Sequence, residues 1–260
     1  MSDRINNSIA ESLEVDNLLL PYMPFLLQDL WALGSSLDLI IETVGNINFP
    51  AKNIRVLDLG CGKGAVSIEI ASKFGFNVIG IDAMSAFLDE ARDKAKEYEV
   101  AKLCRFLKQD ITEYVRYGHK FDLVILAALG GIFGSIRNTV ANLRTQARQG
   151  GYIIIDDGYL KKNQTLNRKG YKHYMNHENT ISELTSFNDA MIREVDTTKL
   201  SLQINKEYLE SIKMRGQELS NKYPELRESI NSYIRLQIEE CDLIKNNLEG
   251  SIWLLQKDGK

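Results

Sequence analysis

The sequence is poor in cysteine, histidine and proline, with three, three and four of these residues among its 260. Cys61, Cys104 and Cys241 are far apart and show no Cys/His spacing typical of zinc sites, so we expect no metal centre and a reducing, cytoplasmic compartment. Long hydrophobic runs are also missing. The stretch from Leu18 to Leu27 is broken by two prolines and is shorter than the ~20 apolar residues of a membrane span. We therefore expect neither a targeting segment nor a membrane partner.

Positive charge is not in excess either, since 32 basic residues face 35 acidic ones and the net charge is -3. With a pI near 5.8, the chain offers no general attraction to nucleic acid or to an anionic membrane. These values favour a small-molecule substrate. The length and the 44% hydrophobic content fit one α/β domain with additions, or two small domains.

The stretch RVLDLGCGKG, from Arg55 to Gly64, concentrates three glycines and one carboxylate in a single turn. The apolar run at 56–59 fits a buried parallel strand, and the apolar residues within 65–74 recur at helical spacing. Glycine carries no Cβ, so a ligand can lie on the backbone where the helix begins and presents free N–H groups. The pattern therefore predicts a ligand site that would suit a carboxylate or a phosphate.

The spacing of the glycines distinguishes the ligand. A dinucleotide-binding turn reads GxGxxG, whereas here the glycines stand at 60, 62 and 64, with Asp58 inside the motif. This combination resembles motif I of the class I S-adenosylmethionine (SAM) dependent methyltransferases, a hydrophobic strand followed by D/E-x-G-x-G-x-G. The resemblance implies that the turn of Gly60, Cys61 and Gly62 approaches the methionine part of SAM. It also implies that Asp58 lies close to the amino group of SAM.

A second acidic residue ends the next predicted strand, Asn77 to Ile81. Asp82 lies 22 positions after Gly60, close to the separation between a nucleotide-binding turn and the carboxylate that holds a ribose. A carboxylate at this place can accept hydrogen bonds from both ribose hydroxyls. We therefore predict that Asp82 and its neighbour Ala83 contact the cofactor. The alternative is that Asp82 only caps the helix that follows.

Two further pairs of residues take their predicted roles from the resemblance. After a short alternating run at 104–108, Asp110 and Ile111 match the family's adenine site, where an acid binds the amine and an apolar side chain covers the ring. Leu126 and Ala127, at the end of the fourth strand, are implied to line the SAM pocket mainly through their backbone. The tetrapeptide N/D-P-P-Y/F/W, which binds target amines in DNA base methyltransferases, is absent here. Nucleic acid is therefore not expected as a substrate.

The acceptor side of the site is less well defined. A fifth strand that ends in Asp156 and Asp157 is predicted to reach the same edge of the sheet as Asp82, where ligands of parallel sheets bind. Adjacent strand residues face opposite ways, so at most one of the two acids is expected to face a substrate. The alternative is that both acids are solvated or cap the next element. The catalytic candidates are Asp157, Tyr159 and His173, and the sequence does not single out a base among them.

A basic loop, KKNQTLNRKGYK from Lys161 to Lys172, follows the fifth strand. It either attracts an anionic substrate or is solvated, as short runs of charge commonly are. Its lysines and arginine are therefore no firm indication of an acceptor.

The predicted elements divide the chain into three parts. Residues 1–50 form an N-terminal helical cap with helices near 24–33 and 37–44. Residues 51–200 and 249–260 form the SAM-binding domain. Residues 201–248 form a helical insertion, far longer than an ordinary strand connection, that either caps the substrate or makes a contact in a homodimer. The resemblance implies a doubly wound, mostly parallel α/β sheet of seven strands in the order 3-2-1-4-5-7-6, with the seventh strand antiparallel.

These observations predict a SAM-dependent methyltransferase that acts on an oxygen or nitrogen atom of a small molecule and yields S-adenosylhomocysteine (SAH). A sulfonium methyl group is already electrophilic, so the protein mainly has to align the nucleophile and exclude water. A SAM-binding protein or enzyme that does not transfer the methyl group would share every cofactor motif. A nicotinamide oxidoreductase would share Asp82 but requires GxGxxG, which is absent.

Overall fold

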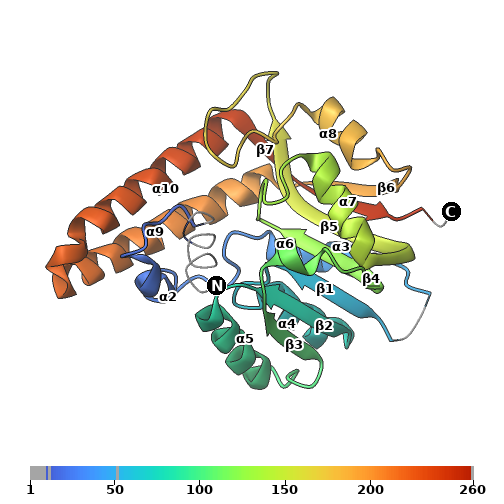
Figure 1. Ribbon diagram of the computed structural model, residues 1–260, viewed down its shortest axis with the longest axis horizontal. Coiled ribbons are helices and arrows are strands. Elements are labelled where there is room, and N and C mark those ends of the chain that lie inside the picture. Colours follow the sequence, from blue (N-terminus) through green and yellow to red (C-terminus); the bar gives the residue numbers. More distant parts are fainter. Residues whose placement is uncertain (1–9, 11–12, 51–52, 259–260) are drawn as a thin grey trace.

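A seven-stranded sheet runs through the computed structural model, which describes residue 10, residues 13–50 and residues 53–258 (Figure 1). The strands are β1 (Arg55–Leu59), β2 (Asn77–Asp82), β3 (Cys104–Lys108), β4 (Phe121–Ala127), β5 (Ala147–Leu160), β6 (Ala190–Asp196) and β7 (Leu248–Gln256). Their spatial order is β3-β2-β1-β4-β5-β7-β6. The strands from β3 to β5 run parallel, and β7 lies antiparallel to β5 and β6. The predicted fold class is confirmed.

Helices cover both faces of the sheet because neighbouring strand residues point to opposite sides. On one face, Val56 belongs to a hydrophobic cluster with α3 (Leu37–Gly45), α4 (Ala65–Phe74) and α5 (Ser85–Glu97). On the other face, Leu57 belongs to a cluster with α6 (Ile111–Tyr114), α7 (Ile136–Gln146) and α8 (His177–Leu184). β1 is therefore buried on both sides, which is why its sequence reads as a nearly continuous apolar run.

A third hydrophobic cluster joins the N-terminal segment to the helical insertion. The insertion consists of α9 (Thr198–Lys222), η2 (Pro224–Leu226) and α10 (Arg227–Asn247), and its two long helices form a pair that extends beyond the sheet (Figure 1). The N-terminal segment contains η1 (Leu20–Tyr22) and α2 (Met23–Leu26). Met23 from this segment and Ile212 from α9 are both fully buried in the cluster. Two regions far apart in the sequence thus form one layer.

Three element boundaries differ from the prediction. The helix expected at 24–33 is the single turn α2, and further on the φ angles of Leu33 and Gly34 are +48° and +95°, outside the range of a right-handed helix. β5 continues through Asp156 and Asp157 to Leu160, because β7 pairs with it as far as that residue. α9 begins at Thr198, before the insertion that was predicted to begin at residue 201. The helix predicted at 37–44 is confirmed as α3.

Small parts of the predicted divisions lie outside the described residues, namely 1–9, 11–12 and 51–52 near the start and 259–260 at the end. The division of the chain into cap, cofactor domain and insertion stays a prediction. None of the helices in the described part of the chain has the length and apolar character needed to cross a membrane.

Gly64, which precedes α4, shows how closely the glycine turn is packed. Its φ is +78°, and a Cβ there would lie 2.9 Å from the Cβ of Ala91 and 3.0 Å from the ring of Phe106. Gly75, which follows α4, has a similar φ of +68° but open space around it. We expect Gly64→Ala to lower the free energy of unfolding by about 1–3 kcal/mol more than Gly75→Ala, the usual cost of overpacking a core. Urea unfolding of both variants measures the difference, and equal losses would contradict this packing argument.

Candidate functional site

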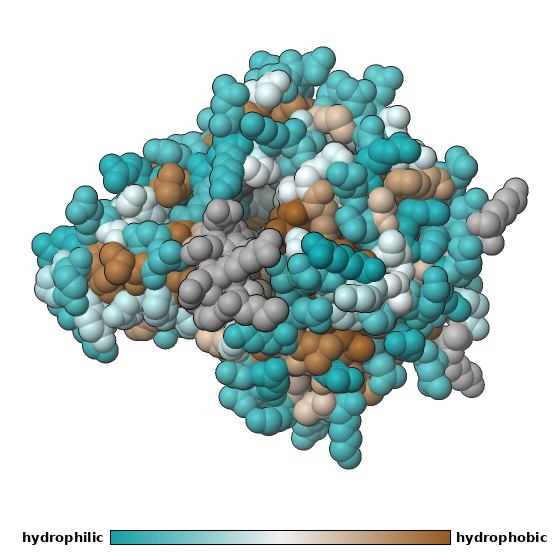
Figure 2. Space-filling model, viewed as in Figure 1, coloured by the Kyte–Doolittle hydropathy of each residue, from teal (hydrophilic) through white to brown (hydrophobic). Residues whose placement is uncertain are grey.

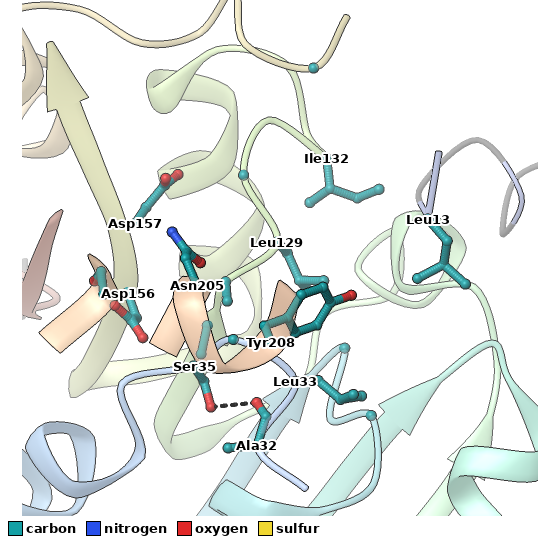
Figure 3. Close-up of a pocket in the computed structure, with 18 of the residues that line it drawn as sticks. Leu13, Ala32, Leu33, Ser35, Leu129, Ile132, Asp156, Asp157, Asn205 and Tyr208 are labelled. Atoms are coloured by element: carbon teal, nitrogen blue, oxygen red, sulfur yellow. Dashed lines mark hydrogen bonds between the residues drawn. The ribbon is translucent and has the colours of Figure 1, made fainter. Parts of the chain in front are cut away.

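A cavity of about 740 Å³ lies at the carboxyl edge of the sheet, beneath the N-terminal segment and the helical insertion (Figure 3). Figure 2 shows a mostly hydrophilic face with apolar residues gathered near its centre. Ten of the predicted site residues line the cavity: Asp58, Gly60, Cys61, Gly62, Asp82, Ala83, Asp110, Ile111, Ala127 and Asp157. Leu126, Tyr159 and His173 do not. The volume is within the roughly 300–1,000 Å³ of small-molecule sites.

Three backbone amides of the glycine turn have partners within the protein. The N–H groups of Gly60 and Cys61 donate to the carbonyl of Ile81, and that of Gly62 donates to Asp82. A Cβ on Gly60 would lie 2.2 Å from the Cδ1 of Leu129, so this side chain lies directly against the glycine. The prediction that N–H groups at the start of α4 contact a ligand stays a prediction.

Asp82 lines the cavity and also accepts hydrogen bonds from the backbone on either side of it, although the N-cap residue of α5 is Met84. The Oδ2 of Asp82 accepts a hydrogen bond of 2.9 Å from the N–H of Gly62, and its Oδ1 accepts one of 2.8 Å from the N–H of Met84. Burial raises the pKa of this carboxyl group. Each carboxylate oxygen accepts more than one hydrogen bond in general, so a partner in the cavity can be added. Asp82 thus organises the turn before α5 and also faces the cavity.

Asp58 is buried, with 3% of its surface exposed. The hydroxyl of Ser67 donates to its Oδ2 at 2.6 Å. Burial raises the pKa of Asp58 to about 6, and the nearby charge of Asp82 contributes to the increase. A cationic group placed beside the two carboxylates would offset their repulsion. This environment fits the amino group that the family resemblance places near Asp58.

The predicted adenine and fourth-strand residues divide between the cavity and the core. Asp110 caps α6, and both the N–H and the hydroxyl of Thr112 donate to its Oδ1, while Ile111 beside it lies against the cavity. Ala127 also lines the cavity. Leu126 is 3% exposed and packs in the hydrophobic cluster under α7. The alternation of a strand explains why only one of these two neighbours reaches the cavity.

Asp157 and His173, two of the catalytic candidates, are in contact, although His173 itself does not line the cavity. The Nδ1 of His173 lies 2.8 Å from the carbonyl oxygen of Gly170, and its Nε2 lies 3.3 Å from the Oδ2 of Asp157. A carbonyl oxygen only accepts hydrogen bonds, so Nδ1 carries a hydrogen. Nε2 of His173 and Oδ2 of Asp157 are thus within hydrogen-bond distance, and Asp157 is the one of the two that lines the cavity.

Tyr174 and Tyr159 occupy different positions around this pair. The hydroxyl of Tyr174, which no sequence pattern singled out, donates to the Oδ1 of Asp157 at 2.7 Å, and Tyr174 lines the cavity. Tyr159 packs against His177, with ring centroids 4.6 Å apart, and lies outside the cavity lining. Burial, followed by a hydrogen bond to Glu249, raises the pKa of Tyr159. The structure therefore brings Tyr174, rather than Tyr159, beside Asp157.

The basic loop turns one of its charges inward. Arg168 is 12% exposed and forms an ion pair with Glu14 of the N-terminal segment. It also donates to the carbonyl of Leu236 in α10 at 3.1 Å and lies 3.9 Å from Glu240. Arg168 is thus neither solvated nor free to attract an anionic substrate, the two alternatives for this loop. It connects the N-terminal segment to the insertion instead.

Lys63 was missed by the sequence analysis, although it lies within the glycine motif. Its side chain is completely buried, and Nζ donates to the carbonyl of Leu27 at 2.8 Å and pairs with Glu90 at 3.0 Å. The indole N–H of Trp31 donates to the carbonyl of Lys63 at 3.3 Å. The local sequence did not indicate that this lysine is buried. Its partners come from other parts of the chain, namely the N-terminal segment and α5.

Asp156 holds the N-terminal segment to β5. Its Oδ2 accepts a hydrogen bond of 2.7 Å from the N–H of Ser36, the residue before α3, and its Oδ1 lies 3.3 Å from the Ser36 hydroxyl. Burial raises the pKa of Asp156 to about 7. Asp156 and Asp157 point in different directions, but both line the cavity, so the expectation that at most one of them faces it is wrong (Figure 3).

The raised pKa of Asp156 has a consequence for stability. Between its unfolded pKa of 3.8 and its folded pKa of about 7, the folded protein binds the proton more tightly, so this group's contribution to stability falls as the pH rises. At about 1.36 kcal/mol per pKa unit, we expect wild type to lose about 2 kcal/mol relative to Asp156→Asn between pH 5 and 7.5. Urea unfolding at both pH values gives the comparison. Parallel stability changes would show that Asp156 keeps the same charge in the folded and unfolded states.

No group of three or more His, Cys, Asp or Glu side chains within the described residues is arranged to hold a metal ion. Burial raises the pKa of Cys61 well above its ordinary value, so its thiol is not an activated nucleophile.

A family model described as a methyltransferase domain matches residues 50–220. Among curated proteins, a ubiquinone biosynthesis O-methyltransferase from Rickettsia akari (strain Hartford) is 30% identical over 120 residues, which cover 46% of each chain. A carboxy-S-adenosyl-L-methionine synthase from a Nitratiruptor species is 44% identical over 62 residues, or 23% of this chain and 25% of that protein. The chain thus aligns with half or less of the length of these relatives.

A solved structure resembles the chain over a longer stretch. The SAM-dependent methyltransferase from Thiobacillus denitrificans, solved in complex with SAH, superposes with a TM-score of 0.74 at 19% sequence identity. The likeness covers 90% of this chain and 97% of that one. At this level of identity the likeness concerns the fold, which agrees with the sheet order described above.

Proposed function

This chain belongs to the methyltransferase-domain family, whose cofactor is SAM, and we propose that it transfers the methyl group of SAM to an oxygen or nitrogen atom of a small molecule. The predicted family is confirmed. The acceptor and the reacting atom remain part of the proposal, since the curated relatives align over about half their length.

One observation carries the proposal: a single cavity holds both the cofactor residues and a second, separate group of polar side chains. The glycine turn, Asp58 and Asp82 lie at the ends of β1 and β2. Asp157 on β5 and Asn205 and Tyr208 on α9 reach the same cavity from the other side (Figure 3). A methyl donor and an acceptor can therefore meet inside one enclosed space, as in-line transfer requires.

The roles of the chain's own residues follow from this arrangement. SAM, when bound, supplies an electrophilic methyl group. Asp82 is proposed to accept hydrogen bonds from the ribose, and Asp58 to balance the amino group. Asp157, oriented by His173 and Tyr174, is proposed to hold the acceptor and take its proton. Leu33 and Leu129, which line the cavity beside the glycine turn, exclude water from the reacting atoms.

We propose that the helical insertion caps the acceptor. Support comes from the residues of α9 and α10 that line the cavity, among them Tyr208 and Glu240. Further support comes from the Arg168–Glu14 ion pair and from the third hydrophobic cluster, which join the insertion to the N-terminal segment. The alternative role, a contact in a homodimer, stays a prediction.

Incubation with SAM and a panel of small acceptors tests the proposed activity. We expect the protein to release SAH only when an acceptor is added, with the methyl group recovered on that acceptor. The alternative is an enzyme that uses SAM without transferring the methyl group. The 44% sequence identity over 62 residues with the carboxy-S-adenosyl-L-methionine synthase supports this alternative. SAM conversion to a product that retains its methyl group would favour this alternative.

A further inference from the structure

The acceptor end of the cavity is rich in carboxylates. Asp157 on β5, Glu240 on α10, Glu249 on β7 and Glu14 of the N-terminal segment all line it. β5 and β7 are neighbours in the sheet, and β4 lies between β5 and the strand β1 that precedes the glycine turn. The carboxylates come from four separate segments of the chain, so their meeting is a result of the fold and not of one acidic stretch.

Tyrosine hydroxyls hold two of these carboxylates in position. Tyr174 donates to Asp157 at 2.7 Å, and Tyr171 donates to Glu240. A neutral hydroxyl orients a carboxylate without cancelling its charge, unlike a lysine or an arginine. The two rings also line the cavity, with centroids 5.3 Å apart, and aromatic faces attract cations.

The positive charges at this end are fewer than the negative ones. Among the described residues, Lys169 is the one basic residue that lines the cavity. Arg168 is not part of the lining but forms an ion pair with Glu14. Lys169 and Arg168 are therefore two cations beside the four carboxylates of Asp157, Glu240, Glu249 and Glu14. Burial raises the pKa of Glu240, and the nearby carboxylate of Glu14 adds to the increase. An anionic acceptor would add to this imbalance, whereas a cation would relieve it.

We propose that the acceptor is an amine, which binds as its ammonium ion between Asp157, Glu240 and the rings of Tyr171 and Tyr174. This inference rests on the proposed function and narrows its reacting atom to nitrogen. Four buried or half-buried carboxylates in a wall with two aromatic rings match the chemistry that recognises ammonium groups. Carboxylate or phosphate acceptors would instead call for arginine forks in the cavity wall.

The proposed methyl transfer to an amine needs only the ammonium group, SAM and the carboxylate of Asp157. The ammonium gives one proton to the Asp157 carboxylate, and the freed electron pair of nitrogen forms a bond with the methyl carbon. The bond from that carbon to sulfur breaks, and its electron pair stays on sulfur to give neutral SAH. The product is a methylated ammonium ion, and the proton on Asp157 passes to solvent.

The test uses matched acceptors that differ only in the reacting group. Benzylamine, benzyl alcohol and benzoate form one series, and butylamine, butanol and butyrate form another. SAH release reports turnover, and calorimetric titration of the SAH-saturated protein reports acceptor binding without turnover. We expect the amines to be methylated at least tenfold faster than their partners and to bind the SAH complex more tightly.

Variants that remove one negative charge each show whether Asp157 and Glu240 bind the amine. We expect Asp157→Asn and Glu240→Gln each to weaken binding of the better amine roughly tenfold, while SAH affinity stays unchanged. Glu97→Gln, an exposed carboxylate on α5, is the matched control. Faster methylation of an alcohol or carboxylate, SAH binding without turnover of any amine, or unaltered amine binding in both variants would overturn the amine proposal. Failure to bind SAM and SAH would instead contradict the proposed function.

Discussion

Replacement of Asp82 by alanine is expected to weaken SAM binding by about 3 kcal/mol, or roughly 150-fold, while the fold is retained. The carboxylate lines the cavity at the end of β2 and is proposed to accept two hydrogen bonds from the ribose. Each hydrogen bond to a charged group is worth about 1.5–3 kcal/mol. Calorimetric titration with SAM measures the loss directly.

Two further variants separate cofactor contact from a structural effect. Asp82 also accepts hydrogen bonds from the backbone of Gly62 and Met84, so its loss loosens the turn. Asp82→Asn keeps the size and one acceptor oxygen, and we expect it to bind SAM more weakly than wild type with near-native urea unfolding. Asp89→Ala, an exposed carboxylate on the neighbouring α5, should bind SAM as wild type does. Full affinity in both Asp82 variants would remove Asp82 from the cofactor site.

Replacement of Lys63 by alanine is expected to lower the free energy of unfolding by about 3–5 kcal/mol, the cost of breaking a buried charged interaction. Lys63 is fully buried, donates to the carbonyl of Leu27 and pairs with Glu90. Its removal leaves a buried carbonyl without a donor and empties the space of its aliphatic stem. Urea unfolding measures the loss.

Lys63→Met separates these two contributions, because methionine fills much of the same space without donating a hydrogen bond. We expect its loss of stability to be smaller than that of Lys63→Ala but still above about 1 kcal/mol. Lys73→Ala, which breaks an exposed ion pair with Glu69 on α4, should cost less than about 0.5 kcal/mol. If Lys63→Ala costs no more than Lys73→Ala, Lys63 does not hold the N-terminal segment to the turn.

Local patterns made the cofactor side of the fold predictable. The acidic residue and alternate glycines at 58–64 lie in one turn, and Asp82 follows the next strand, so each signal needs only a few neighbouring residues. All of the predicted cofactor residues except Leu126 line the cavity. The side chain of Leu126 packs in the core under α7, and a contact through its backbone stays a prediction.

The acceptor side depends on contacts between distant segments, and for that reason the sequence did not reveal it. Arg168 meets Glu14 across 154 positions, and Asp156 meets Ser36 across 120. β5 continues past Asp157 only because the antiparallel β7 pairs with it there. Tyr174 became relevant only when the fold placed its hydroxyl on Asp157. No spacing rule within one element links such pairs.

Calorimetric titration of the full chain with SAM, SAH and NAD tests the central claim most directly. The glycine spacing, Asp58 and Asp82 predict micromolar binding of SAM and SAH and no heat of binding for NAD. That result would establish the cofactor and leave only the acceptor to be identified. Binding of NAD alone would contradict the account, because the same turn and Asp82 would then serve a nicotinamide cofactor.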